Sequence, residues 1–274
     1  MGFYQVRNLT TCFQNRTENA VNGVSFEFGN GEILGLVGES GSGKSALALT
    51  MLRLLPPGSR FTGEFLIDGK EVLGKSEGEF RRYRGRRLGI IFQETESALS
   101  PVFSIGKQLR EALSLHEPDL SKEELHAGTM ELLKKVGLPD PESMAAAYPH
   151  QLSGGMRQRV MIALAISGKP DLLVADEPTT ALDVTIQAQI LELLRSLARE
   201  MKMSLLLITH NLSIVANYCD LVLIMKNGKI IESGTVEEIF SRPKEDYTKS
   251  LLELGKQLES GNRIDRLKTF ENQS

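Results

Sequence analysis

The sequence lacks any apolar run long enough to cross a membrane. Its longest continuous runs, such as Leu205–Ile208 and Leu221–Met225, cover only a few residues, whereas a membrane-spanning helix needs about 20. The opening residues, Met1 to Thr10, also lack the pattern of a signal peptide. We therefore expect a soluble protein, which could work at a membrane only by docking on partners that span it.

Cysteine is scarce, and neither sign of charge dominates. The two cysteines, Cys12 and Cys219, have no metal-ligand spacing, and such an isolated pair is typical of a reducing cytosol. The 32 basic and 35 acidic residues give a net charge of −3. This balance offers no overall electrostatic attraction for nucleic acid.

One short segment departs from this balance. It gathers the basic residues Arg81, Arg82, Arg84, Arg86 and Arg87. A contact with a phosphate backbone is one interpretation. We favour the other, in which the cluster is a solvated face or is neutralised by the nearby Glu77 and Glu79.

Continuous apolar runs predict a buried parallel sheet. Strands that are covered on both faces are apolar throughout, whereas half-exposed strands alternate. The runs of the first kind are Ile33–Val37, Leu88–Phe92, Leu172–Ala175, Leu205–Ile208 and Leu221–Met225. Nearer the N-terminus, Phe3–Leu9 and Val24–Phe28 alternate, which predicts a smaller antiparallel sheet with turns at Gly23 and at Gly29-Asn30-Gly31.

Helical patterns fill most of the remaining chain. We expect helices at Lys44–Leu55, which stops before Pro56, and at Val184–Met201, which has one apolar face. A further helix begins at Ser121, with Glu124 completing a capping box, and ends at Gly137. The whole stretch 97–165 is helical in pattern and interrupts the alternation of strands and helices. The sequence thus predicts a core over 1–96 and 166–240, an inserted helical subdomain over 97–165, and a C-terminal helix with a frayed tail over 241–274.

A glycine-rich loop links the first continuous apolar strand to the helix that follows it. The segment Gly38-Glu39-Ser40-Gly41-Ser42-Gly43-Lys44-Ser45 fits the pattern G-x-x-x-x-G-K-[ST] in its required strand–loop–helix context. Glycines let backbone N–H groups curl around a phosphate, and the helix N-terminus adds a positive dipole end. We expect Lys44 to hold the β- and γ-phosphates of ATP and Ser45 to ligate Mg²⁺. An ordinary glycine-rich turn is the less specific alternative.

Two carboxylates stand where another apolar strand leaves the sheet. Asp176 and Glu177 follow Leu172–Ala175 directly, and ligands of open α/β sheets bind at that carboxyl edge. Asp176 can hold Mg²⁺, and Glu177 is then placed to act as the general base for an attacking water. A pair of solvated charges in a loop is the alternative, which the phosphate loop makes secondary.

A second candidate anion site opens another helix. Ser153, Gly154 and Gly155 precede the apolar stretch Val160–Ile166, and small residues with free N–H groups at a helix start favour anions. An N-cap with a flexible turn explains the same residues. One nucleotide has little use for two phosphate cradles from one chain. In a symmetric dimer both cradles have a use, if each chain's second cradle closes on the γ-phosphate held by the other chain.

These motifs together resemble those of ABC transporter ATPase subunits over nearly the whole chain. Besides the phosphate loop, the resemblance rests on Ile90-Ile91-Phe92-Gln93, the signature Leu152–Gln158, the Asp176-Glu177 strand end, the loop Ala181-Leu182-Asp183, and His210 after the strand Leu205–Thr209. It implies an α/β fold: a P-loop (RecA-like) core with a mostly parallel sheet, an N-terminal antiparallel β-subdomain and an inserted α-helical subdomain.

The resemblance also implies roles for individual residues. Gln93 looks like the residue that contacts Mg²⁺ and the attacking water and senses the membrane subunit. His210 looks like the switch residue at the γ-phosphate, and Asp183 like the residue that communicates across the dimer. Phe13 aligns with the aromatic that stacks on adenine, although a core or surface aromatic is a near-equal alternative. Residues 94–106 are similar to the segment that contacts the membrane subunit.

Several stretches resemble the oligopeptide, dipeptide and nickel importer group in particular. They include Leu99–Phe103, Tyr148–Ser153 and Asp183–Gln189. The tail departs from this group: no cysteine follows Cys219, which excludes a cysteine-ligated iron–sulfur cluster, and Glu245-Asp246-Tyr247-Thr248 stands where the group often has His-Pro-Tyr-Thr.

The implied assembly is a transporter with this chain as a peripheral subunit on the cytoplasmic face of the cell membrane. Its partners would be a second ATPase subunit, identical or related, transmembrane permease subunits and an extracytoplasmic substrate-binding protein, without nucleic acid. Two other hypotheses stay open: a soluble ABC ATPase acting on nucleic acid or the ribosome, and a scaffold that binds nucleotide without hydrolysing it.

Overall fold

The computed structural model describes residues 3–14, 16–93, 98–180 and 182–254 of the chain. Its largest sheet has six strands in the order β10-β9-β3-β8-β7-β6. Five of them run parallel, and β10 pairs antiparallel with β9 at one edge. The bounds are β3 Ile33–Val37, β6 Leu88–Ile91, β7 Leu172–Asp176, β8 Ser204–Thr209, β9 Leu221–Lys226 and β10 Lys229–Thr235. The predicted mostly parallel core sheet is confirmed.

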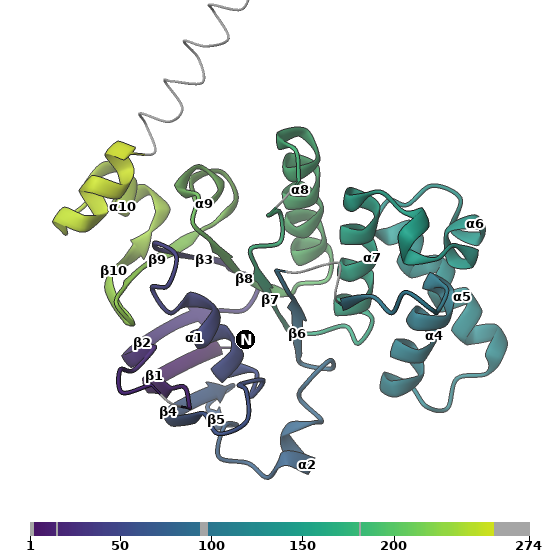
Figure 1. The fold of residues 1–274 in the computed structure, drawn as a ribbon, viewed down its shortest axis with the longest axis horizontal. Coiled ribbons are helices and arrows are strands. Elements are labelled where there is room, and N and C mark those ends of the chain that lie inside the picture. Colours follow the sequence, from purple (N-terminus) through teal and green to yellow (C-terminus); the bar gives the residue numbers. More distant parts are fainter. Residues whose placement is uncertain (1–2, 15, 94–97, 181, 255–274) are drawn as a thin grey trace, which may run out of the picture.

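A second, antiparallel sheet is built from the N-terminal part of the chain, as predicted. Its order is β2-β1-β4-β5, with β1 Phe3–Cys12, β2 Val21–Gly29, β4 Arg60–Ile67 and β5 Lys70–Glu71. The helix α1, Lys44–Met51, shares one apolar core with this sheet and one face of the six-stranded sheet. Figure 1 shows α1 beside β1 and β2.

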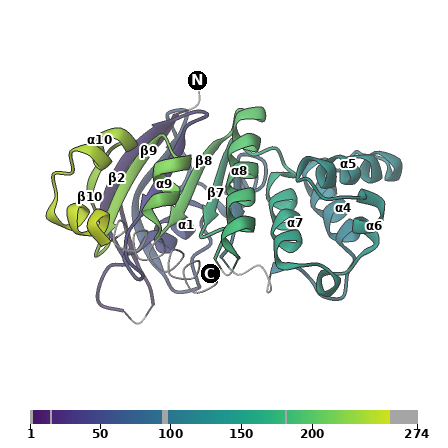
Figure 2. The ribbon, with the colours of Figure 1, turned by 90° about the horizontal axis from the view of Figure 1, so that it is seen from above.

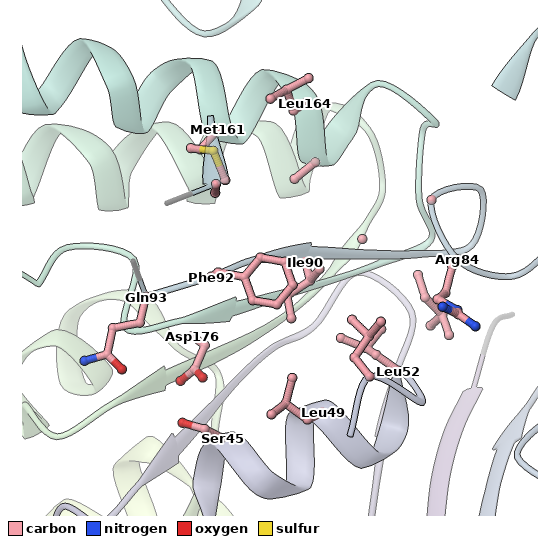
Figure 3. Close-up of a pocket in the computed structure, with 16 residues that line it drawn as sticks. Ser45, Leu49, Leu52, Arg84, Ile90, Phe92, Gln93, Met161, Leu164 and Asp176 are labelled. Atoms are coloured by element: carbon pink, nitrogen blue, oxygen red, sulfur yellow. The ribbon is translucent and has the colours of Figure 1, made fainter. Parts of the chain in front are cut away.

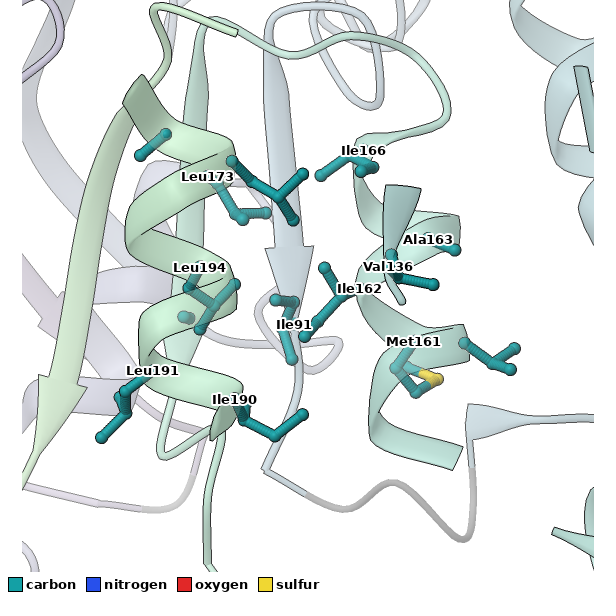
Figure 4. Packing of buried hydrophobic residues seen from close by; sticks show 14 of the residues in the cluster. Ile91, Val136, Met161, Ile162, Ala163, Ile166, Leu173, Ile190, Leu191 and Leu194 are labelled. Carbon is teal, nitrogen blue, oxygen red and sulfur yellow. The ribbon is translucent and has the colours of Figure 1, made fainter. Parts of the chain in front are cut away.

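The opposite face of the large sheet carries the other main core. Alternate residues of β8 separate the two: Leu205 and Leu207 belong to this second core, and Leu206 and Ile208 to the first. Helices α7, Gly154–Ile166, and α8, Val184–Glu200, supply its helical side. Figure 4 shows Ile162 of α7 and Leu194 of α8 pointing toward strand residues such as Ile91.

A group of helices stands to one side of both sheets (Figures 1 and 2). It comprises α4 Ile105–His116, α5 Lys122–Lys135, α6 Pro141–Ala146 and the short 3₁₀ turn η1 Pro149–Gln151, which leads into α7. The predicted capping box of Ser121 and Glu124 is present. Gly137 follows the end of this helix at φ 70°, as expected.

The structure corrects several sequence-based boundaries. The first helix was expected to reach Leu55, but it ends at Met51 because Arg53 adopts a positive φ of 50°. Amide bonds from Arg53 to the Thr50 carbonyl and from Leu54 to the Leu49 carbonyl then close the helix end. Gly23 is not a turn: it lies inside β2, at φ 63°, where the pairing with β1 shifts register.

The remaining elements lie at the C-terminal end. The two-turn helix α9, Leu212–Tyr218, packs on β3, and α10, Val236–Ser241, follows β10. Residues 246–254 form a further helix, so the expected final helix starts later than Ser241. The short α2, Glu77–Phe80, follows β5. The described residues do not include Ala181, residues 94–97 or residues 255–274, which belong to the predicted C-terminal helix and frayed tail over 241–274.

Candidate functional site

The phosphate loop crosses the carboxyl edge of the large sheet between β3 and α1. Its first glycine packs directly on other backbone: a Cβ at Gly38 would lie 2.1 Å from the Met225 carbonyl oxygen. Gly43 has φ 107° and would place a Cβ 2.1 Å from the Ala20 carbonyl oxygen. Both positions exclude any side chain, so this loop geometry requires glycine.

The N-terminal end of α1 faces the phosphate loop. Gly43 is its N-cap, and no side chain caps the helix at that residue. Because the first N–H groups of a helix lack internal partners, such an end attracts anions. The loop is held from behind by the β9–β10 turn, where the Gly228 amide donates to the Ser42 carbonyl over 2.9 Å.

Lys44 lies folded back over this loop and is only 6% exposed. Its Nζ donates to the carbonyl oxygens of Gly38, at 2.8 Å, and Glu39, at 2.9 Å. Burial lowers the pKa of this ammonium, while the carboxylates of Glu177 and Asp176 act in the opposite direction. A third, longer contact joins Nζ to the Ser42 hydroxyl at 3.5 Å. A buried cation whose partners are uncharged can exchange them for a stronger anionic partner.

Asp176 is the last residue of β7 and is 8% exposed. Burial raises the pKa of its carboxyl group, against the effect of a hydrogen bond with the Ser45 side chain. Its Oδ1 is buried and has no hydrogen-bond partner within the described chain. A buried carboxylate oxygen without a partner is costly unless a cation or donor completes it.

Glu177 follows in a conformation that few non-glycine residues adopt. Its φ is 46°, and its amide donates to the Ile208 carbonyl of the neighbouring strand over 3.0 Å. Its carboxylate contacts His210 Nδ1 at 3.1 Å and accepts from Thr180 Oγ1 at 2.9 Å and, less closely, from Gln93 Nε2 at 3.4 Å. Burial alone would raise the pKa of Glu177, but the bonds from His210 and Thr180 outweigh it and lower the pKa.

The structure therefore gathers most of the predicted site residues around one cavity of about 690 Å³. Its lining includes Ser40, Gly41, Gly43, Lys44, Ser45, Gln93, Glu177 and His210. Phe13, Arg16 and Ala20 complete the side where β1 leads toward β2. Phe13 therefore lies beside the phosphate loop, half-buried against the first core.

The second predicted cradle lies elsewhere. Ser153 is the N-cap of α7, accepts from the Met156 amide at 3.3 Å, and is exposed. Neither Ser153 nor Gly154 nor Gly155 is among the described residues that line the cavity. Gly155 packs against α8, since a Cβ there would lie 2.8 Å from Ile186.

Asp183, too, stands apart from the cavity of its own chain. It is the exposed N-cap of α8 and accepts from the Ile186 amide at 3.0 Å. Asp183 and the Ser153–Gly155 cradle thus begin two adjacent helices that contact each other. Within the described part of the chain, Ser153, Gly154 and Asp183 are exposed at these two helix starts.

An apolar groove of about 680 Å³ adjoins the cavity. Figure 3 shows it between Leu49 of α1 and Leu52, the residue after that helix, on one side and Met161 and Leu164 of α7 on the other, with Arg84 at the far end. The near end holds Ser45 and Gln93, which also line the first cavity. Sequence reasoning missed this groove, because its walls come from distant segments.

Comparisons with known proteins bear directly on this arrangement. Residues 21–180 match the description of the ABC transporter family. The chain belongs to this family. It is an ATP-binding ATPase of the ABC type, and its six-stranded and antiparallel sheets form the ABC cassette fold.

Relatives from the ABC family are similar in sequence to this chain over most of its length. The oligopeptide transport ATP-binding protein OppD of Bacillus subtilis is 49% identical over 93% of this chain and 72% of its own length. The glutathione import ATP-binding protein GsiA of Escherichia coli is 44% identical over 97% of this chain, which spans only 44% of GsiA. A solved dimeric ATP-binding cassette in a post-hydrolysis state, bound to ADP and Pi, is 28% identical with a TM-score of 0.74, over 85% of this chain and 98% of its own.

The arginine cluster gains no nucleic-acid role from the structure. Arg84 pairs with Glu77, as expected, and Arg87 pairs with Asp68 and Asp171. Glu79, the other predicted partner, instead closes a capping box with Ser76. The comparisons give no support to an ABC ATPase that acts on nucleic acid.

Two further residues of the ABC site were not predicted. Thr180 contacts the Glu177 carboxylate, and Arg16 lies beside Phe13 at the cavity. Thr180 could have been noticed as a hydroxyl three residues after the base. Arg16 lies in a loop whose sequence has no pattern that predicts where its side chain points.

A first prediction concerns the loop backbone. Gly38→Ala should lower the free energy of unfolding by about 1–3 kcal/mol, the usual cost of overpacking, and should weaken ATP binding, because its Cβ would overlap the Met225 carbonyl. Gly78→Ala is the matched control, since Gly78 is helical and a Cβ there meets nothing within 4 Å. Urea denaturation and ATP titration measure both variants. Equal behaviour of the two would contradict the packing argument.

Proposed function

We propose that this chain hydrolyses ATP in the cavity between the phosphate loop, Asp176 and Glu177, and that hydrolysis drives import of peptides across a cell membrane. The observation that carries the catalytic part is the meeting of a buried ammonium and an ionised glutamate at one cavity with the unpartnered buried carboxylate oxygen of Asp176 at the adjoining groove. Phosphoryl transfer to water needs these three kinds of group.

The triphosphate would lie along the loop. Lys44 would leave the carbonyl groups of Gly38 and Glu39 for the β- and γ-phosphates, and the amides from Gly41 to Ser45 would surround the β-phosphate. Phe13 would stack on adenine, with Ser40 and Ser42 in the supporting loop. Because burial lowers the pKa of the Lys44 ammonium, the negative charge of a phosphate would stabilise its protonated form.

A magnesium ion fits the oxygen ligands at the border between the cavity and the apolar groove. Asp176 offers a buried oxygen without a partner, and the Ser45 hydroxyl is bonded to the same carboxylate. One carboxylate and one hydroxyl suit Mg²⁺, which keeps several waters and binds phosphate oxygens. We therefore propose that Ser45, Asp176 and Gln93 hold it directly or through water. When bound, it neutralises charge on the phosphate oxygens.

Glu177 is proposed as the general base for the attacking water. Its lowered pKa keeps it ionised at neutral pH, and Thr180 and His210 hold its two carboxylate oxygens. The unusual positive φ directs it from the strand end into the cavity. His210, 64% exposed at its side chain, would reach the γ-phosphate, and Gln93 would orient the water.

The hydrolytic site is proposed to be shared between two chains. Ser153, Gly154 and Gly155 lie outside their own chain's cavity yet form an exposed helix start suited to anions. A two-fold dimer would place this cradle on the γ-phosphate of the opposite chain, with Asp183 at the same contact. The solved relative in the post-hydrolysis state is itself dimeric. A homodimer and a pair with a related ATPase both fit.

Transport across a membrane requires partner subunits that span it. Among the helices of residues 3–254 that the structure describes, none has the length and apolar character to cross a bilayer. We propose that permease subunits bind at the apolar groove and residues 98–106, beside Gln93, which would place the chain on the cytoplasmic face of the membrane. A substrate-binding protein outside the membrane would complete an importer. The division into a core, a helical subdomain at 97–165 and a tail from 241 belongs to the same proposal.

Peptides are the proposed cargo because of the relatives. Their printed names include oligopeptide transport and glutathione import, and glutathione is itself a small peptide. Nickel-like substrates, which the sequence resemblance also allowed, have no named relative among these proteins.

The second prediction tests the base. Glu177→Gln should lower kcat for ATP hydrolysis by about 10²- to 10⁴-fold while ATP affinity stays near that of the wild type, because the amide keeps the shape of the side chain but cannot accept the water's proton. Phosphate release and equilibrium ATP binding measure the two quantities. Glu192→Gln, on the exposed face of α8, is the control and should hydrolyse normally.

The same variant tests the transport reaction in the cell of origin. Uptake of a labelled tripeptide should stop when the only copy of the chain carries Glu177→Gln, and uptake of free amino acids should continue. Loss of nickel uptake with normal tripeptide uptake would identify nickel, and not a peptide, as the transported substrate. Normal uptake of both would remove this chain from peptide and nickel import.

The third prediction tests the metal ligands. Mg²⁺ added together with ATP should raise the thermal midpoint of the wild type further than ATP alone, because a bound cation stabilises the folded state. Asp176→Asn should abolish that additional rise. Asp119→Asn, in an exposed loop, should retain it. An unchanged magnesium effect in Asp176→Asn would exclude Asp176 as a ligand.

The fourth prediction tests the shared site in a chain that pairs with itself. Lys44→Ala and Gly154→Asp should each be inactive alone, but their mixture should recover up to about a quarter of wild-type ATPase activity, since half the dimers then hold one intact site of two. ATPase assays on mixed and unmixed samples measure this recovery. A site completed within one chain predicts no recovery.

A further inference from the structure

The C-terminal helix, residues 246–254, contacts the phosphate loop through one side chain. The Glu39 amide donates to the Tyr247 hydroxyl over 3.3 Å. Tyr247 is therefore hydrogen-bonded to the main chain of a loop residue that lies 208 positions earlier in the sequence.

The Tyr247 ring is fixed on the structure that supports the loop from behind. Lys226 Nζ lies 4.3 Å from the ring centroid, within the range of a cation–π contact. Lys226 ends β9, and the turn that follows it supplies the Gly228 amide that bonds to Ser42. The ring and the loop thus share one support, the β9–β10 hairpin.

The helix that carries Tyr247 is itself held in place. Glu232 of β10, 8% exposed, accepts from the Lys244 amide at 2.7 Å and the Glu245 amide at 3.2 Å, just before the helix begins. Leu252 is buried in a cluster that includes Val37, the residue before the phosphate loop. These contacts leave the Tyr247 hydroxyl little freedom to move away from Glu39.

The position of Glu39 affects the residue that faces the phosphates. Its N–H bonds to Tyr247, and its carbonyl accepts from Lys44 Nζ at 2.9 Å. The first peptide groups of the loop are therefore held from opposite sides, by the C-terminal helix and by the phosphate-binding lysine.

We propose that Tyr247 is a positioning residue of the ATP site, which makes the C-terminal helix a structural part of the phosphate loop. It acts through Glu39 and does not touch the nucleotide. The proposal rests on the phosphate-binding role proposed above for this loop. Because linkage is reciprocal, occupation of the loop by ATP in turn stabilises the seat of the helix.

The test uses the full chain and removes only the hydroxyl. Tyr247→Phe keeps the ring and its contact with Lys226, so the fold stays intact, but Glu39 loses its partner. Loss of this hydrogen bond should weaken Mg-ATP binding by about 3- to 10-fold and raise KM by a similar factor, with kcat unchanged. Tyr218→Phe, on α9, is the matched control and should bind as the wild type does.

Pyrophosphate as a competitor locates the effect. It occupies the phosphate loop without contacting Phe13, so its affinity in Tyr247→Phe should fall by the same factor as that of ATP.

Three results would overturn the inference: unchanged ATP affinity in Tyr247→Phe, weaker ATP binding with unchanged pyrophosphate binding, or a lowered thermal midpoint of the nucleotide-free variant that accounts for the loss. A wild-type chain that fails to bind Mg-ATP would instead remove the proposed function on which the inference rests.

Discussion

Two buried charges of opposite sign govern the site. Lys44 and Asp176 are both less than a tenth exposed, and burial shifts the pKa of each toward its neutral form. Charges in such surroundings are costly unless partners compensate them. The partners present in the described chain are incomplete, since Asp176 retains an oxygen without a hydrogen bond. A polyanion together with a divalent cation would compensate both residues at once.

This constraint explains the form of the phosphate loop. Lys44 bonds to the carbonyl groups of Gly38 and Glu39, which are uncharged and therefore weaker partners than phosphate. The loop can offer these carbonyl groups only because glycine lets its backbone lie directly against Met225 and Ala20. Backbone packing thus fixes the loop, and the fixed loop determines where the lysine rests. Binding requires a change of partners rather than a change of fold.

Sequence predicted the local parts of the site better than their surroundings. The phosphate loop, the Asp176-Glu177 strand end and His210 each stand in a short pattern with its own strand or helix, so their meeting at one sheet edge follows from parallel topology. The strands β4 and β10 were missed because their patterns are irregular: β4 contains Gly63 at φ 102°, and β10 is a polar edge strand. The α1 boundary failed because an arginine, not a glycine, adopts the positive φ that ends the helix.

Contacts between distant segments were beyond any local pattern. The bond between Tyr247 and Glu39 joins residues 208 positions apart, and nothing in the spacing of either motif indicates it. The position of Ser153 outside its own cavity is likewise a property of the folded chain, although the presence of two anion cradles had already suggested a second chain. Sequence identifies which groups can do chemistry, and tertiary packing decides which of them meet.

The residues at the border between the cavity and the groove show how ATP hydrolysis could be coupled to movement of a bound partner. Ser45, Leu49 and Gln93 line both spaces, so a partner in the groove and a nucleotide in the cavity would contact the same three residues from opposite sides. Gln93 also bonds to Glu177 over 3.4 Å. A shift of β6 by a bound partner would therefore alter the distance between Gln93 and the proposed base, and loss of the γ-phosphate would act on β6 in return. Coupling of this kind needs no long pathway, because one side chain separates the two sites.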